Sequence, residues 1–157
     1  MSAQSIYDQA PLGALIRYSD GTPRPPQRFK NKLAAWENNN SVGRLVRKAA
    51  SRTIGNHTTP ASFTLHQGDF GSASVVVLKV FKTFSVGSPL TFTIVERPKP
   101  GMVGVLDRAG EGGELLHLAD NRAAAQTWLA SHRYADAVLD EVVDDDATAD
   151  SGEGRAA

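Results

Sequence analysis

Apolar and polar residues alternate along several short stretches of this chain, and this two-residue period predicts β-strands. The alternation is strongest over residues 75–86, whose even-numbered positions are Val76, Leu78, Val80, Lys82, Phe84 and Val86. We expect this even-numbered face to be buried, because the odd-numbered face is half polar beyond Val77. The same pattern predicts further strands at residues 12–18, 43–48, 63–65, 90–95, 102–107, 114–118 and 137–143.

Turn-forming residues between these strands predict two antiparallel hairpins. Residues 87–89, Gly-Ser-Pro, join the strongest strand to the strand at 90–95, and the glycine-rich residues 109–113 join the next two strands. Residues 67–69, Gln-Gly-Asp, predict a further turn, and residues 49–60 are expected to form a polar loop.

A three-to-four-residue period of apolar side chains predicts two helices. The first begins after Pro26 and ends near Glu37, with Phe29, Leu33 and Trp36 on one buried stripe. The second follows in the C-terminal third of the chain, where apolar residues again recur at helical spacing.

The second helix is expected over residues 121–132, with Asp120 as its N-cap and Trp128 on its buried face. Hairpins grouped between two isolated helices argue against parallel βαβ units. We therefore predict an α+β fold: a mostly antiparallel sheet of about six strands with two helices packed on it through Trp36 and Trp128.

The 157 residues fit one domain of ordinary size with tails. We predict an N-terminal arm over residues 1–11, a single α+β domain over residues 12–143 and a disordered acidic tail over residues 144–157. The tail contains no large apolar residue, so it cannot bury enough surface to offset the entropy lost on ordering.

The composition narrows the classes of protein that this chain represents. It contains no cysteine, which excludes disulfides, thiolate metal sites and cysteine nucleophiles. Its longest apolar run, residues 75–78, is far too short to span a membrane, and its first residues lack the pattern of a signal peptide. We expect a cytoplasmic bacterial protein that does not associate with membranes.

A net charge of zero conceals a strong separation of charge along the chain. Residues 1–54 carry nine Lys and Arg against three Asp and Glu, whereas residues 100–157 carry four against twelve. A basic first third and an acidic last third indicate charged partners, or ends that screen each other.

The basic residues of the first third lie within 36 positions of one another and form the first candidate site: Arg17, Arg24, Arg28, Lys30, Lys32, Arg44, Arg47, Lys48 and Arg52. Nucleic-acid binding requires such charges, because neutralising phosphates releases counterions. Phe29 and Trp36 are interleaved with them, but their place on the predicted core stripe removes them as base-stacking candidates. The alternative interpretation is a solvated helix face with ordinary surface arginines.

Lys79 and Phe81 share the odd-numbered face of the strongest strand and form a second candidate site. Sheets that bind single strands place aromatic and basic side chains on an open face of this kind. The alternative is that this face belongs to the core or is covered by a helix.

No pattern of catalytic, metal-binding or cofactor-binding residues is recognisable. The four histidines lack the spacing of a zinc helix, and no G-x-S-x-G elbow is present. Residues 110–113 lack the Lys-Ser/Thr of a phosphate-binding loop, and the acidic run lacks the ligand spacing of a calcium loop. His66 and Asp69 flank a glycine and are expected to form a structural contact.

These observations predict a small non-enzymatic binding protein that acts on DNA or RNA through its basic N-terminal third. The alternative is a protein-interaction module, an inhibitor or accessory subunit, that engages a basic protein partner through the acidic tail or an open sheet face. An enzyme ranks last, and no cofactor is expected.

Overall fold

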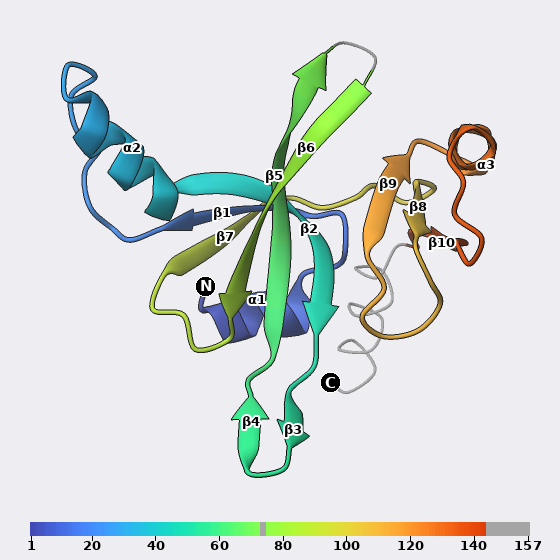
Figure 1. Ribbon diagram of the computed structural model, residues 1–157, viewed down its shortest axis with the longest axis horizontal. Coiled ribbons are helices and arrows are strands. Elements are labelled where there is room, and N and C mark those ends of the chain that lie inside the picture. Colours follow the sequence, from blue (N-terminus) through green and yellow to red (C-terminus); the bar gives the residue numbers. More distant parts are fainter. Residues whose placement is uncertain (73–74, 144–157) are drawn as a thin grey trace, which may run out of the picture. The chain divides into compact units, whose positions relative to one another are not determined.

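The computed structural model describes residues 1–72 and 75–143, which divide between two compact units. The first unit is Met1–Arg97 with Gly110–Glu114, and the second is Pro98–Ala109 with the described part of Leu115–Ala157. The first unit combines two helices, and the second unit one helix, with antiparallel strands (Figure 1), so the predicted α+β class is confirmed. The predicted acidic tail lies outside the described residues.

The first unit is built around one antiparallel sheet of five strands, in the order β6-β5-β2-β1-β7, instead of the six strands expected. Its elements are α1 (Ala3–Gln9), β1 (Leu15–Ser19), α2 (Lys30–Asn39), β2 (Ser41–Ala49), β3 (Arg52–Ile54), β4 (His57–Thr59), β5 (Ser62–Ser72), β6 (Val75–Ser85) and β7 (Thr91–Glu96). Helix α1 is a third helix that the sequence pattern did not predict, because it is only seven residues long.

The predicted hairpin between β6 and β7 is wrong. Strand β6 pairs with β5, whereas β7 pairs with β1 at the other end of the sheet. In a flat sheet these two edge strands would lie about 19 Å apart, since neighbouring strands are about 4.8 Å apart. The rings of Phe84 on β6 and Phe92 on β7 nevertheless have centroids 5.3 Å apart. The sheet therefore curls, and its two edges meet across the core.

Two other local predictions are corrected. Residues 67–69 form no turn, because β5 continues through them and the register shifts between His66 and Gly68, as in a β-bulge. Residues 52–59, expected as a loop, form the short β3–β4 hairpin, in which Gly55 adopts a φ of +60°. A bulge and a tight hairpin both contain the polar and glycine residues that are also typical of loops.

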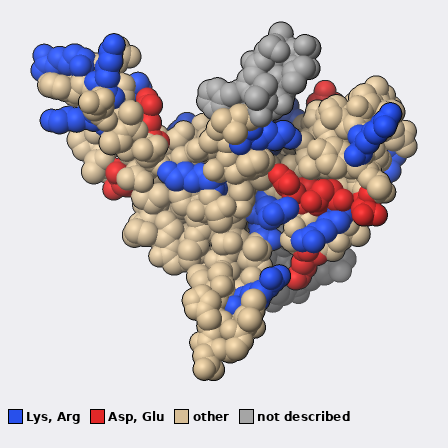
Figure 2. All heavy atoms as spheres, in the orientation of Figure 1, with Lys and Arg blue, Asp and Glu red and all other residues tan. Residues whose placement is uncertain are grey.

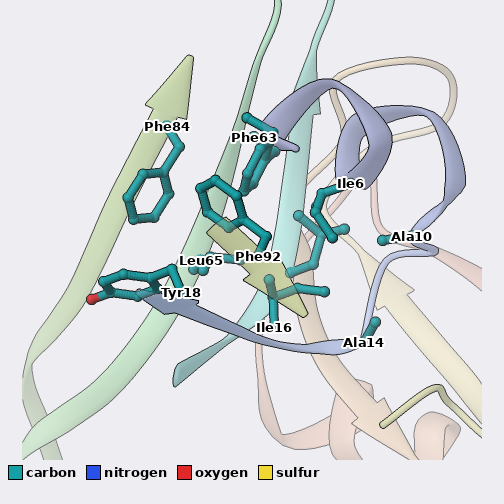
Figure 3. Packing of buried hydrophobic residues seen from close by; sticks show 11 residues of the cluster. Ile6, Ala10, Ala14, Ile16, Tyr18, Phe63, Leu65, Phe84 and Phe92 are labelled. Atoms are coloured by element: carbon teal, nitrogen blue, oxygen red, sulfur yellow. The ribbon is translucent and has the colours of Figure 1, made fainter. Parts of the chain in front are cut away.

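The core of the first unit lies on the concave face of the curled sheet (Figure 3). Phe63, Phe84 and Phe92 contact one another edge to face or tilted, with centroids 5.3 to 5.7 Å apart. Helix α1 closes this face with Ile6, which is fully buried. The amino group of Met1 donates to the Phe92 carbonyl oxygen at 2.7 Å, which ties the start of the chain to β7.

Helix α2 does not pack on the sheet as predicted. It buries no residue, Phe29 is 41% exposed just before its first turn, and Figure 1 shows it extending away from the sheet. Three apolar residues among charged and amide side chains make too narrow a stripe to hold a helix against a core. Trp36 is instead half-buried at the base of the helix, where its indole N–H donates to the Thr22 carbonyl oxygen at 3.0 Å.

The second unit has a three-stranded antiparallel sheet in the order β10-β8-β9. Its elements are β8 (Val103–Leu106), β9 (Leu115–Ala119), α3 (Arg122–Ser131) and β10 (Val138–Glu141). The predicted β8–β9 hairpin is confirmed, and Trp128 packs against this unit's core as expected. The N-cap of α3 is Asn121 and not Asp120, because the Asn121 side chain accepts from the Ala124 amide at 2.8 Å.

Three rings stack in the second unit, with Trp128 between His117 and His132. The planes are nearly parallel, at 3° and 9°, with centroids 5.0 and 3.9 Å from that of the indole. Burial lowers the pKa of His117, and the neighbouring His132 lowers it further, against an opposing effect of Asp120. The folded state therefore favours the neutral form of His117.

Acidification is expected to destabilise the second unit through His117. Since folding depresses the pKa of His117, its contribution to stability is complete above the ordinary histidine pKa of about 6.5 and is lost as the pH falls below it. His117→Phe, which keeps an aromatic ring and removes the titration, should flatten the fall in thermal stability between about pH 6.5 and 5. His57→Gln, in the exposed β4 strand, is the control and should leave the profile unchanged.

Removing the ring of Phe92 is expected to destabilise the first unit severely. Phe92→Ala deletes the contacts with Phe63 and Phe84 and should cost about 3–5 kcal/mol of unfolding free energy, measured by urea denaturation. Phe29→Ala, at an exposed ring, should cost about 0.5 kcal/mol or less. Equal effects of the two substitutions would contradict the assigned core.

Candidate functional site

The five-stranded sheet presents a second face, opposite the aromatic core, which we call the outer face. Side chains alternate between the two faces of a strand, so residues beside buried ones lie on the outer face. Arg17, for example, is exposed between the buried Ile16 and Tyr18. The outer face includes Arg17, Val42, Arg44, Arg47, Thr64, His66, Asp69, Lys79, Phe81, Thr83 and Thr93.

The strand register places cations and rings of the outer face in adjoining rows. Arg44, His66 and Phe81 lie directly opposite one another on β2, β5 and β6. Arg17 lies opposite Val42, two residues from Arg44, so the Cα atoms of the two arginines are diagonal neighbours about 7–8 Å apart. The Arg44 guanidinium donates to the Gly13 carbonyl oxygen at 2.6 Å, which holds it against the sheet.

Phe81 is 42% exposed, and its ring lies 5.3 Å from that of His66. The Nε2 atom of His66 donates to the Asp69 carboxylate at 2.6 Å, so the predicted contact of these two residues is confirmed. Lys79 is exposed and lies opposite Asp69 across the β5–β6 pair. The outer face at β6 thus carries the exposed ring of Phe81 and, two residues away, the cation of Lys79, whose charge is offset in part by Asp69 on the neighbouring strand.

The other two basic residues of β2, Arg47 and Lys48, do not add free cations to this surface. Arg47 lies opposite Thr64, and its guanidinium is 3.6 Å from the Glu114 carboxylate. Lys48 is on the concave side, where its ammonium lies 5.8 Å from the Tyr7 ring and burial lowers its pKa. The register shift between Leu45 and Arg47 decides this arrangement.

Arg52 lies apart from the outer face, exposed on the β3–β4 hairpin. The other four predicted cations are gathered on and before α2: Arg24, Arg28, Lys30 and Lys32. Figure 2 shows Lys and Arg side chains concentrated over this projecting helix. Within residues 1–72 and 75–143, none of these four forms an ion pair with a carboxylate, and Arg28 and Lys32 lie 4.9 and 5.2 Å from the Phe29 ring centroid.

Summed over its residues, the first unit carries twelve Lys and Arg against seven Asp and Glu, a net charge of +5. The second therefore holds the opposite excess, because the whole chain is neutral. The fold thus divides the predicted basic cluster among the outer face, the concave side, the β3–β4 hairpin and α2, and an ion pair with a carboxylate forms at Arg47.

A cavity of about 260 Å³ lies between the outer face and the base of α2. It is lined by Arg17, Tyr18, Ser19, Trp36, Asn40, Ser41 and Val42. Sequence reasoning missed this site because it placed Trp36 on a core stripe and treated the asparagines after it only as a helix stop. The available signal was a large apolar side chain, Trp36, in a helix too polar to pack on a core, which indicated that Trp36 has another role.

Asn40 joins the end of α2 to β1. Its Oδ1 accepts from the Ser19 hydroxyl at 2.8 Å and the Asp20 amide at 3.2 Å, while its Nδ2 donates to the Asp20 carboxylate at 3.1 Å and the Trp36 carbonyl oxygen at 2.8 Å. Hydrogen bonds, first of all from the Thr22 hydroxyl, lower the pKa of Asp20 and keep it charged.

Lys82 supports the same junction from β6. Its ammonium donates to the Asn38 carbonyl oxygen and lies 5.1 Å from the centroid of the Tyr18 ring. The Tyr18 hydroxyl accepts from the Gln67 side chain, and burial raises the pKa of Tyr18, so the phenol stays neutral. Tyr18, which lines the cavity, is therefore held in place by Gln67 and Lys82.

The described residues contain no group of three or more histidine, aspartate or glutamate side chains placed to hold a metal ion. None of the helices in this part of the chain is long and apolar enough to cross a membrane. The described residues offer exposed cations, an exposed aromatic ring and a small cavity, and such features can bind an anionic or aromatic ligand.

Comparison with known proteins places the chain in a family. No curated protein and no solved structure gave a match. The family model described as "Uncharacterised conserved protein UCP036055" matches residues 1–146, nearly the whole chain. The chain therefore belongs to the family Uncharacterised conserved protein UCP036055.

Proposed function

We propose that this chain is a non-enzymatic nucleic-acid-binding protein whose first unit holds a single strand across the outer face. The observation that carries the proposal is the register that sets Arg17, Arg44 and the exposed ring of Phe81 on the same outer face of the sheet. The cations gathered on and before α2 add further positive charge to the same unit.

The physical chemistry of this surface fits a polyanion with unpaired bases. Guanidinium groups bind phosphate oxygens through paired hydrogen bonds, and each phosphate neutralised releases counterions. An aromatic ring on an open sheet offers a stacking platform, which a base inside a duplex does not use. Phe81 therefore favours a single strand over a duplex.

The alternative of a protein-interaction module that uses the acidic tail concerns residues 144–157, outside the described residues, and it stays a prediction. Its open-face version shares Phe81 and Val42 with the proposal, and both side chains are partly exposed. Failure to bind any nucleic acid would leave this version as the better assignment.

The proposal predicts salt-dependent binding of a fluorescently labelled deoxythymidine oligonucleotide, measured by anisotropy. Affinity should fall steeply between about 50 and 200 mM salt, and each lost phosphate contact should reduce the log–log slope by about 0.7. Arg17→Ala should reduce the slope by about one such step. Arg133→Ala, an exposed cation of the second unit, is the matched control and should change nothing. Equal effects of both variants, or no binding at about 50 mM salt, would overturn the proposal.

A second prediction distinguishes the contribution of base stacking from that of charge. Phe81→Ala should lower the affinity about fivefold or more without changing the salt slope, because it removes a ring and no charge. A labelled duplex should bind more weakly than the single strand and should not respond to Phe81→Ala. Tighter duplex binding would contradict the single-strand assignment.

The contribution of α2 is tested by reversing its free charges. Arg28→Glu, Lys30→Glu and Lys32→Glu together should weaken single-strand binding at least about tenfold at low salt. The first unit should stay folded, because α2 buries no residue. Circular dichroism checks the fold, and unchanged affinity in a folded variant would exclude α2 from the interface.

A further inference from the structure

We propose that the cavity between α2 and the outer face is a slot for one unpaired nucleobase, with Arg17 holding the phosphate beside it. This inference rests on the proposed function and deepens it, because it assigns a specific pocket on the path of the strand. The slot is formed by Trp36 at the base of α2, by Tyr18 of β1 and by Val42 of β2.

The size of the cavity limits what it can hold. At about 260 Å³ it lies below the range of about 300–1,000 Å³ typical of sites for drug-sized ligands. One planar ring system fits such a space, whereas a whole dinucleotide or a peptide helix does not. The occupant is therefore a small flat group.

Charge decides which flat group this is. Arg17 lines the cavity and is exposed, and no carboxylate within the described residues forms an ion pair with it. A ligand that combines an apolar ring with an anion next to it uses both the slot and Arg17. A nucleotide within a single strand has this combination, since every base is joined through its sugar to a phosphate.

Trp36 lines the cavity and has no free hydrogen-bond donor to offer an occupant. Its indole N–H is already used by the Thr22 carbonyl oxygen, and the Arg24 guanidinium lies 6.0 Å from its ring centroid. Base–aromatic stacking tolerates any base, because every base has a π face. Trp36 is therefore the stacking platform of the slot.

Asn40 is a positioning residue and does not read the base. Both lone pairs of its Oδ1 and both protons of its Nδ2 are engaged with Ser19, Asp20 and Trp36. The Ser19 hydroxyl is likewise engaged, because it donates to Asn40 Oδ1 and accepts from the Gly21 amide. With these groups occupied, the slot selects by shape and stacking, and we expect weak sequence preference.

Tryptophan fluorescence reports on the slot directly. The chain has two tryptophans, so Trp128→Phe in the full-length protein leaves Trp36 as the sole source of the signal. A deoxythymidine octamer and thymidine 5′-monophosphate should both quench Trp36 to saturation. An octamer of the same backbone without bases should bind more weakly and should not quench.

Substitutions at the slot separate stacking from folding. Trp36→Leu should weaken octamer binding roughly fivefold to a hundredfold with an unchanged salt slope, and Trp36→Phe should restore most of the affinity. Trp36→Leu also removes the hydrogen bond to Thr22, so a second variant is needed in case α2 loosens. Val42→Phe fills the slot from β2, keeps every charge, and should reproduce the loss.

The outcomes distinguish the slot from the wider proposal. If the octamer binds but Trp36 is not quenched and Val42→Phe has no effect, the slot is wrong and single-strand binding stands. If the octamer fails to bind but the monophosphate quenches Trp36 and Val42→Phe abolishes the quenching, the slot stands and the strand-binding proposal falls. If neither probe acts, both fail.

Discussion

The contact between Phe84 and Phe92 is the constraint on which the first unit depends. These residues lie on strands at opposite ends of a five-stranded sheet, yet their rings meet edge to face with centroids 5.3 Å apart. Only a strongly curled sheet permits this approach, and the curl creates the concave space that Phe63 and Ile6 of α1 fill. Burial of these side chains supplies the favourable free energy, since apolar surface removed from water stabilises at about 25 cal/mol per Å².

The same packing also sets the surface that we propose binds nucleic acid. A strand that turns Ile16 and Tyr18 into the core must turn Arg17 outward, because successive side chains point to opposite faces. The outer face thus carries the side chains that point away from the core, and the register sets Arg44 in a row with His66 and Phe81. Packing of the core therefore decides which cations and rings are available on the outer face.

Helix α2 owes its place to polar contacts at one end. The amide of Asn40 ties it to Ser19 and Asp20, and the ammonium of Lys82 holds the Asn38 carbonyl oxygen. A helix held only at its base exposes its cations and leaves a cavity beside Trp36, where a helix packed along the sheet would leave none.

Local pattern by itself determined the α+β class, helix α3, the β8–β9 hairpin and the separation of charge, because each depends on neighbouring residues. It also located the strands β1, β2, β6, β7, β8, β9 and β10. Tertiary structure decided the pairing of β6 and β7, since a short Gly-Ser-Pro connection is compatible with a hairpin and with a curled sheet alike. It also decided that Lys48 faces α1 while Arg47 pairs with Glu114, through a shift of register that no alternation reveals. The place of Trp36 depended on its hydrogen bond to Thr22 and on the bonds that join Asn40 to Ser19 and Asn38 to Lys82. Contacts between residues so far apart leave no periodic pattern in a sequence.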